Sequence, residues 1–322
     1  MLDFSFNDRE RKSEVFMIEV FFKSLKDTEF HRINEFKVGC WVHASNATLE
    51  DLDKIMELTD IDFGDLKDSL DRYETPRIEH DQDNILIFTR HPNEFEGGLY
   101  TSTLTILLTP NFVVTISPLK SQVVEKILSS TLRIGSTQKS KLLFHILMKI
   151  TQDFNSNIKR VRHSVLEQEK QIQNIDSDDI VVLAKNEEIL NQYLTSLVPM
   201  KSLLDAISSG RFVHLYEKDL DLLQDLTLAI KQSEDLCSVN IKSIRSLRDS
   251  YQIIFTNDVN KTIKRLTAIT IIFTIPTIIA SVYGMNVSLP FEKSPYAFFL
   301  IMNMIIVFSF FSIVIFMRKK WL

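Results

Sequence analysis

Two long apolar stretches near the C-terminal end dominate the hydropathy pattern of this 322-residue chain. The first covers residues 266–282 without a charged residue, and the second covers residues 297–316. A helix rises about 1.5 Å per residue, so stretches of this length are near or above what is needed to cross a hydrocarbon core of about 30 Å. We therefore predict two membrane spans, over about residues 263–282 and 297–316.

Polar side chains follow one face of the first predicted span. They recur in alternating steps of three and four residues, which places them on one helical face together with Ile263. The members of this polar stripe are Thr256, Asn260, Thr267, Thr270, Thr274, Thr277 and Ser281. Such a stripe should face protein or water rather than lipid. Two interpretations stay open: a water-filled path, which we favour, and hydroxyls that bond back to their own helix and let it pack closely against others.

Basic residues flank both predicted spans on the same side. They are Lys261, Lys264 and Arg265 beside the first span, and Arg318, Lys319 and Lys320 after the second. The connecting loop carries only Glu292 and Lys293. The positive-inside rule therefore predicts that both termini lie in the cytoplasm and the loop outside. The expected location is the plasma membrane.

Short runs rich in β-branched and aromatic residues indicate an α/β fold in the first 120 residues. We predict strands over residues 15–22, 36–43, 84–89, 101–109 and 112–117. Pro110-Asn111 predicts a tight turn, so the last two strands should be antiparallel neighbours. Thr48 before two acidic residues predicts a capped helix start. Further along, residues 158–172 and 180–197 predict two amphipathic helices, the second closed by Pro199.

A stretch free of both Gly and Pro runs from Gly210 to Pro276, with apolar residues at heptad-compatible positions. One helix that starts near Leu215 and runs into the membrane would be about 100 Å long. A single-chain globule does not accommodate such a helix, so we predict several copies side by side in a homo-oligomer. The expected organisation is a cytoplasmic α/β domain over residues 1–200, a long stalk helix over 201–260 and a membrane domain over 261–322.

Composition narrows the function. The net charge of −5 argues against nucleic acid as a partner, and Cys40 and Cys237 are expected to be reduced thiols. No Gly-rich phosphate loop and no zinc-type histidine spacing occurs, so we predict neither enzymatic activity nor a cofactor. Residues 50–83 hold 13 acidic residues against four basic ones. Carboxylate oxygens are ligands that Mg²⁺ prefers, although such a run is usually a solvated helical face.

Three motifs lie around the two spans. They are Tyr283-Gly284-Met285-Asn286 at the outer end of the first span, the basic tail ending in Lys320-Trp321-Leu322, and the preceding pattern Asn260…Leu266-Thr267…Pro276-Thr277. Together these motifs resemble those of the CorA family of magnesium transporters. The likeness extends into the soluble part and covers most of the chain. The resemblance implies a homopentamer in the lipid bilayer, with residues 283–286 forming the outer selectivity site.

The chemistry of Mg²⁺ suits such a site. The ion sheds water reluctantly, so a selective site should hydrogen-bond its hydration shell with neutral oxygens. A ring of Asn286 amides fits this requirement, with Asn260 and the polar stripe below it and Ile263 and Leu266 as a hydrophobic constriction. We therefore predict a channel-like transporter that admits hydrated Mg²⁺ down its electrochemical gradient. Gly284 either supplies a backbone conformation that side chains resist or merely ends the helix.

Three acidic residues are further candidates. Glu292 either concentrates cations at the outer loop or is an exposed acid without a role. Counting back from Pro76-Arg77-Ile78-Glu79, the resemblance places Asp68 at an acidic cation-sensing position. Counting back along the long helix from Asn260, the resemblance places Asp225 at the position that a neighbouring subunit turns toward Asp68. A divalent ion bridging the two would hold the pore shut, so that Mg²⁺ is both substrate and regulator; otherwise they are two surface acids.

Two alternatives remain open for the function as a whole. The same architecture could carry another divalent cation, such as Co²⁺, Ni²⁺ or Zn²⁺, although Met285 disfavours a zinc exporter. A membrane-anchored scaffold or sensor is the other, but a simple anchor has no need of the polar stripe.

Overall fold

The fold is described from a computed structural model, over residues 18–95, 98–131, 133–170, 177–213, 215–287, 290 and 295–321. The chain divides into two compact units. The first comprises Met1–Gln171 and Asp176–Ser246, and the second comprises Ile172–Ile175 and Leu247–Leu322. Helix α6 (Glu217–Tyr283) contributes to both, and the residue 200 boundary expected from the sequence falls inside helix α5 (Ser177–Ser208).

A seven-stranded sheet in the order β2-β1-β3-β7-β6-β5-β4 forms the centre of the first unit. Its strands are β1 (Ile18–Phe22), β2 (His31–Ile33), β3 (Trp41–Ser45), β4 (Arg77–Asp81), β5 (Asn84–Phe95), β6 (Gly98–Leu108) and β7 (Val113–Ser117). Every neighbouring pair is antiparallel except β3 and β7, which run parallel. The predicted antiparallel pair around Pro110-Asn111 is confirmed, with Leu108 opposite Val113.

Several strand boundaries differ from the sequence prediction. The strand expected over residues 36–43 begins only at Trp41, because Gly39 adopts a left-handed φ of 84° in the turn before it. The first strand begins at Ile18; residues 15–17 lie outside the described part of the chain. Strands β2 and β4 were not predicted, since both are short, polar edge strands without an apolar alternation.

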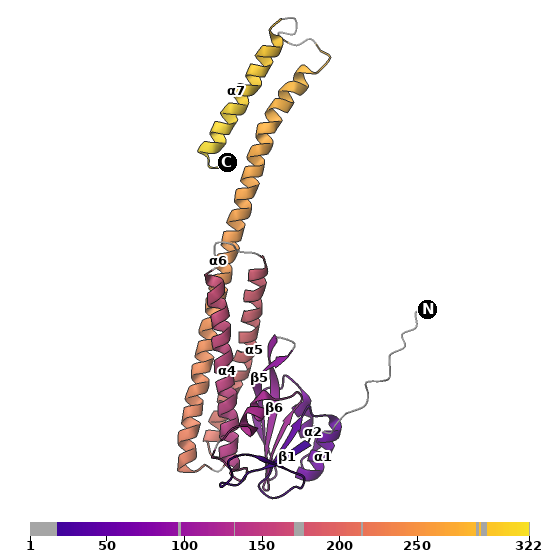
Figure 1. Ribbon diagram of the computed structural model, residues 1–322, viewed down its shortest axis with the longest axis vertical. Helices are drawn as coiled ribbons and strands as arrows, with labels where there is room; N and C mark the ends of the chain where they lie inside the picture. The colour runs from indigo at the N-terminus through magenta and orange to yellow at the C-terminus, as the bar shows by residue number, and fades with distance from the viewer. Residues whose placement is uncertain are drawn as a thin grey trace, which may run out of the picture. The chain divides into compact units, whose positions relative to one another are not determined.

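The sheet is covered on both faces (Figure 1). On one face, α1 (Leu49–Thr59) and α2 (Phe63–Lys67), followed by the 3₁₀ turn η1 (Asp68–Leu70), pack on alternate strand residues such as Val42 and Phe88. The predicted start of α1 is confirmed, because Thr48 and Asp51 form a capping box. On the other face lie α3 (Gln122–Leu128), α4 (Lys139–Glu169) and α5.

Helices α4 and α5 and the first-unit part of α6 lie side by side (Figure 1). The thiol of Cys237 on α6 donates to the Leu190 carbonyl of α5 at 3.0 Å, and burial raises the pKa of this thiol to about 12. Cys40 is buried too, and both cysteines are free, as expected. The prediction that the helix ends at Pro199 is wrong, because Pro199 lies inside α5. There it removes one helical hydrogen bond and crowds the preceding turn.

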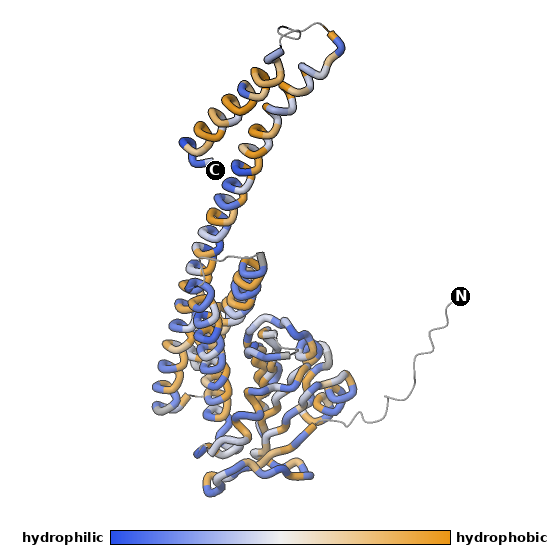
Figure 2. The backbone as a smooth tube through the Cα atoms, turned by 45° about the horizontal axis from the view of Figure 1, so that its top comes forward, coloured by the Kyte–Doolittle hydropathy of each residue, from blue (hydrophilic) through white to orange (hydrophobic). Residues whose placement is uncertain are grey.

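The second unit contains the end of α6 and all of α7 (Ala297–Arg318). Both helices are long and apolar enough to cross a membrane, and Figure 2 shows the apolar residues gathered along α7 and the neighbouring end of α6. Each predicted span lies inside its helix. The predicted unbroken helix is also confirmed, since α6 extends over 67 residues from Glu217, two residues after the expected start.

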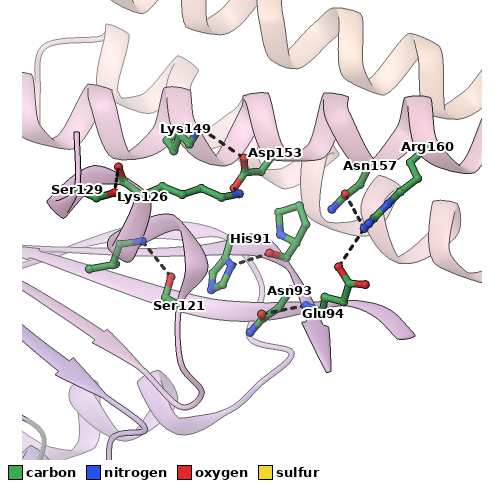
Figure 3. A network of polar contacts seen from close by, with 12 residues as sticks. His91, Asn93, Glu94, Ser121, Lys126, Ser129, Lys149, Asp153, Asn157 and Arg160 are labelled. Atoms are coloured by element: carbon green, nitrogen blue, oxygen red, sulfur yellow. Dashed lines mark hydrogen bonds and ion pairs between the residues drawn. The ribbon is translucent and has the colours of Figure 1, made fainter. Parts of the chain in front are cut away.

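Ion pairs attach α3 and α4 to the end of β5 (Figure 3). Lys126 on α3 bonds Asp153 on α4 at 2.8 Å, and Arg160 on α4 contacts Glu94 on β5 at 3.2 Å. His91 lies beneath these contacts, fully buried, with its Nδ1 2.9 Å from the Pro92 carbonyl. The two ion pairs therefore lie above a buried histidine that is neutral at pH 7.

Two buried histidines, His43 on β3 and His91 on β5, make the stability of the first unit sensitive to acid. Burial lowers the pKa of His43 and of His91 from 6.5 to about 4 in each case. His43 is 4% exposed and its Nδ1 lies 2.9 Å from the Thr115 hydroxyl. Because the unfolded chain binds protons near pH 6.5 and the folded chain only near pH 4, the neutral rings contribute stability that is complete above about pH 6.5 and is lost as the pH falls toward 4.

We predict that the free energy of unfolding decreases by up to about 3 kcal/mol per histidine between pH 7 and pH 4. The measurement is urea unfolding of the full chain in detergent, followed by the fluorescence of buried Trp41 in a Trp321→Phe background. His43→Gln and His91→Gln should each reduce this pH dependence. His80→Gln, at an exposed position of β4, is the matched control. An unchanged pH dependence in both buried-site variants would contradict the assignment.

Candidate ion pathway and cation-sensing site

The polar stripe occupies an open face of α6 in the second unit. All seven polar members are exposed in the single chain, as are Ile263 at 54% and Leu266 at 65%. The structure thus places every sequence-predicted pore residue from Thr256 to Thr277 on one continuous helix. Among the residues that the structure describes, none covers these side chains enough to bury them, so the stripe is available to water or to another subunit.

Four hydroxyls of the polar stripe are oriented by their own helix. Thr270, Thr274 and Thr277 donate to the carbonyls four residues earlier at 2.8, 2.7 and 2.9 Å. Thr256 does the same at 2.7 Å. Each hydroxyl proton is thereby directed toward the backbone, which leaves the oxygen lone pairs as acceptors on the outer face. This bonding agrees with the close-packing interpretation and equally with an acceptor-lined water path.

Pro276 adds a feature that sequence reasoning did not use. Proline has no N–H, so the carbonyl of Ile272 loses its normal helical donor within the apolar span. A carbonyl in this position needs another donor, which neighbouring side chains or water can supply. The sequence signal was a proline inside an otherwise apolar span.

The Gly-Met-Asn segment follows directly after the last helical residue, Tyr283. The Gly284 N–H bonds the carbonyls of Ala280 at 2.9 Å and Ser281 at 3.2 Å, and both Met285 and Asn286 are exposed. Gly284 is not in the left-handed region, so the structure favours the helix-end interpretation over a special backbone conformation. A Cβ at this position would lie 3.2 Å from the Ala280 oxygen, a tight but adjustable contact.

The candidate sensing residues lie in the first unit. Asp68 begins η1, and its Oδ2 is 2.7 Å from Nη2 of Arg77. Asp225 is exposed on α6. Within the described part of the chain, no three His, Cys, Asp or Glu side chains gather closely enough to hold a metal ion. Glu292 lies outside the described residues.

Sequence reasoning also missed Arg77 as a partner of Asp68. Its guanidinium pairs with Glu74 and Glu79 as well, so one cation is held by three carboxylates. The available signal was an arginine among the carboxylates of the acidic stretch, but the pairing depends on how η1 approaches β4. Partial desolvation, and then the charges of Asp81 and Glu79, raise the pKa of nearby Asp65, as expected where carboxylates crowd together.

Comparison with known proteins places these features in a family. The family model described as CorA-like Mg²⁺ transporter protein matches residues 36–319. The cobalt/magnesium transport protein CorA of Methanocaldococcus jannaschii is 26% identical over 293 residues, which cover 88% of this chain and 91% of that protein. A magnesium transport protein CorA of Campylobacter jejuni is 30% identical over 109 residues, 32% of this chain and 33% of that protein.

Solved structures show the same fold. The complete structure of the CorA magnesium transporter from M. jannaschii matches with a TM-score of 0.78 and 24% identity, covering 95% of this chain and 98% of that chain. The full-length CmaX protein matches with a TM-score of 0.72 and 16% identity, covering 97% and 100%. The arrangement of an N-terminal α/β unit, a long helix and two C-terminal helices long enough to cross a membrane is therefore one that known proteins share.

The orientation of the hydroxyls predicts which side of α6 meets water. Single cysteines at Thr270, Thr274 and Thr277 should react with a membrane-impermeant thiol reagent in the assembled protein, because their face is acceptor-lined and open. Matched cysteines at Ile271, Ile275 and Ile279 should not react. Labelling is measured by mass shift in a background without Cys40 and Cys237. Equal labelling of both sets would show that the stripe is not a water path.

Proposed function

Because this chain belongs to the CorA-like Mg²⁺ transporter family, we propose that it assembles into a homopentameric channel that admits hydrated Mg²⁺ into the cytoplasm down its electrochemical gradient. The observation that carries the proposal is the polar stripe: an exposed line of oriented hydroxyls on an apolar helix that ends next to Asn286. An anchor or scaffold needs no such line, because each polar group in a lipid-facing span is costly.

The direction of the hydroxyls suits a hydrated cation. Water molecules bound to Mg²⁺ present their protons outward, so a wall that selects the hydrated ion should offer acceptors. The hydroxyls of Thr270, Thr274 and Thr277 donate their protons to carbonyls of the same helix, so their oxygen lone pairs can accept hydrogen bonds from the hydration water. An anion, whose hydration water presents oxygen lone pairs, would meet the same lone pairs unfavourably. The wall therefore favours cations without any charged residue.

The ends of the path have different tasks. A ring of Asn286 amide oxygens accepts hydrogen bonds from the hydration shell at the outer mouth. Ile263 and Leu266, both largely exposed on α6, narrow the inner part where five copies converge and form the hydrophobic constriction. Basic residues at Lys261 and Lys319 favour an orientation in which the inner side of the spans and both ends of the chain lie in the cytoplasm, and the proposed location is the plasma membrane.

Asp68 and Asp225 supply the proposed feedback. Two carboxylates that face each other across a subunit boundary repel, and a divalent ion between them converts repulsion into a bridge. Occupied bridges would hold the subunits in the closed arrangement, and falling cytoplasmic Mg²⁺ would release them. The side chain of Asp68 is 48% exposed, so it is accessible to an ion and to a neighbouring subunit.

A comparison of the flux of different divalent cations would identify the ion that this protein transports. One relative is named a cobalt/magnesium transport protein, so Co²⁺ is the first alternative to Mg²⁺, followed by Ni²⁺ and Zn²⁺. The proposed transport requires that purified protein in liposomes carry at least one of these ions, with Mg²⁺ the fastest under an inward gradient. Absence of flux for all four ions from the assembled protein would reject the transport function and favour a membrane-anchored sensor.

Asn286→Ala should abolish Mg²⁺ flux while the oligomer still assembles, because the variant removes the amide that contacts the hydration shell. Flux is measured with a Mg²⁺-sensitive dye inside proteoliposomes, and assembly by size-exclusion chromatography. Val287→Ala, at the neighbouring exposed position, is the matched control and should retain flux. Wild-type flux from assembled Asn286→Ala protein rules out the proposed selectivity role.

The double variant Asp68→Asn/Asp225→Asn should conduct at internal Mg²⁺ concentrations that close the wild-type channel. Neutral amides no longer repel and no longer bind the bridging ion, so closure should require at least about tenfold more internal Mg²⁺. The midpoint of inhibition by internal Mg²⁺ is the measurement, and Asp221→Asn, an exposed acid one helical turn before Asp225, is the control. If the double variant is half-inhibited at the same internal Mg²⁺ concentration as the wild type, Asp68 and Asp225 are not the sensor.

A further inference from the structure

Arg77 already occupies the carboxylate that is proposed to sense Mg²⁺. Its Nη2 lies 2.7 Å from Oδ2 of Asp68, while Nη1 pairs with Glu74 and Nε with Glu79. The guanidinium carbon lies 4.0 Å from the centroid of the Phe88 ring. The group is thus fixed by three carboxylates and one aromatic face, at the place where a regulatory cation would contact Asp68.

The carboxylates that contact Arg77 differ in how far they are exposed to solvent, and therefore in how easily each contact can break. The side chain of Glu74 is 18% exposed, whereas that of Asp68 is 48% exposed. Asp68 can therefore turn toward solvent while Arg77 keeps Glu74, Glu79 and Phe88. Breaking a partly buried pair is expensive when it leaves one charge without a partner. Here the guanidinium retains two carboxylates, so the release of Asp68 costs little.

We infer that Arg77 is a built-in competitor for the regulatory cation, which sets the Mg²⁺ concentration at which Asp68 becomes available for bridging. This inference rests on the proposed sensing role of Asp68. At low cytoplasmic Mg²⁺ the guanidinium neutralises Asp68 within its own subunit and the bridge to Asp225 is absent. At high Mg²⁺ the divalent ion, with its larger charge, takes Asp68 from Arg77 and joins the two subunits.

The charge balance around Arg77 supports an exchange of this kind. One guanidinium faces the carboxylates of Asp68, Glu74 and Glu79, so the group as a whole remains anionic and attracts a second cation. The Asp68 side of this pair is about half open to water, which weakens the ion pair enough for a divalent ion to displace the guanidinium. Arg77 therefore shifts the threshold of the sensor rather than blocking it.

Removal of the competitor should make the sensor more sensitive. In the full-length oligomer, Arg77→Gln should lower the internal Mg²⁺ concentration for half-inhibition of flux about fivefold, and Arg77→Lys should lower it less. A second readout is the Mg²⁺-dependent rise in melting temperature, which should begin at correspondingly lower Mg²⁺ in Arg77→Gln. Arg72→Gln, an exposed arginine just before the same strand, is the matched control and should behave as wild type. In an Asp68→Asn background, Arg77→Gln should have no further effect.

The outcomes separate this inference from the function on which it rests. If the wild-type channel is inhibited by internal Mg²⁺ and the Asp68→Asn/Asp225→Asn variant is not, the sensor stands. A wild-type midpoint for Arg77→Gln then overturns the competitor role alone. If Arg77→Gln does not assemble, Arg77→Lys decides, because an ammonium cannot hold three carboxylates in the geometry of the guanidinium fork. A wild-type or raised midpoint in Arg77→Lys overturns the inference in that case.

Discussion

The hydrogen-bond requirement of polar groups in an apolar span is the constraint on which the membrane part of this protein depends. A hydroxyl in hydrocarbon must find a partner, and the nearest one is the carbonyl four residues earlier. Thr270, Thr274 and Thr277 all satisfy the requirement in this way. The same bond that makes each threonine tolerable in the span also decides which part of it faces outward. The stability of the helix and the polarity of this helix face are therefore consequences of one interaction.

In the first unit the corresponding constraint is the burial of polar groups between the sheet and its helices. Trp41, His43 and Thr115 satisfy one another beneath α3, with the Trp41 Nε1 2.9 Å from the Thr115 hydroxyl. These groups are neutral and paired, so they add specificity at little electrostatic cost. Charged pairs such as Lys126–Asp153 lie further out, where water still reaches them. The acidic cluster around Arg77 lies on the opposite face, with α1 and η1. A change in this acidic cluster therefore need not disturb the buried histidines on the other face.

The parts of this structure that the sequence predicted are those whose signal is local. Thr48 and Asp51 cap α1 through contacts three residues apart, and the absence of Gly and Pro sufficed to predict α6. The edge strands β2 and β4 were missed because pairing with β1 and β5, not their own residues, makes them strands. The partnership of Arg77 with Asp68 was missed for the same reason. Gly284 was open to two interpretations because a glycine after a helix permits many conformations, and only the folded backbone shows that this one avoids the left-handed region.

The parallel pairing of β3 with β7 has a consequence for the order in which the chain folds. The Trp41 and Thr115 side chains that join these strands are 74 positions apart in the sequence, whereas β5, β6 and β7 follow one another directly. The local meander of β5 to β7 can form as soon as it is synthesised, but β3 must wait for it with its apolar face unpaired. Loop-closure entropy then makes the docking of β3, together with β1 and β2, the slow step of the first unit. Until that step is complete, the sheet exposes an edge that can pair with another nascent copy.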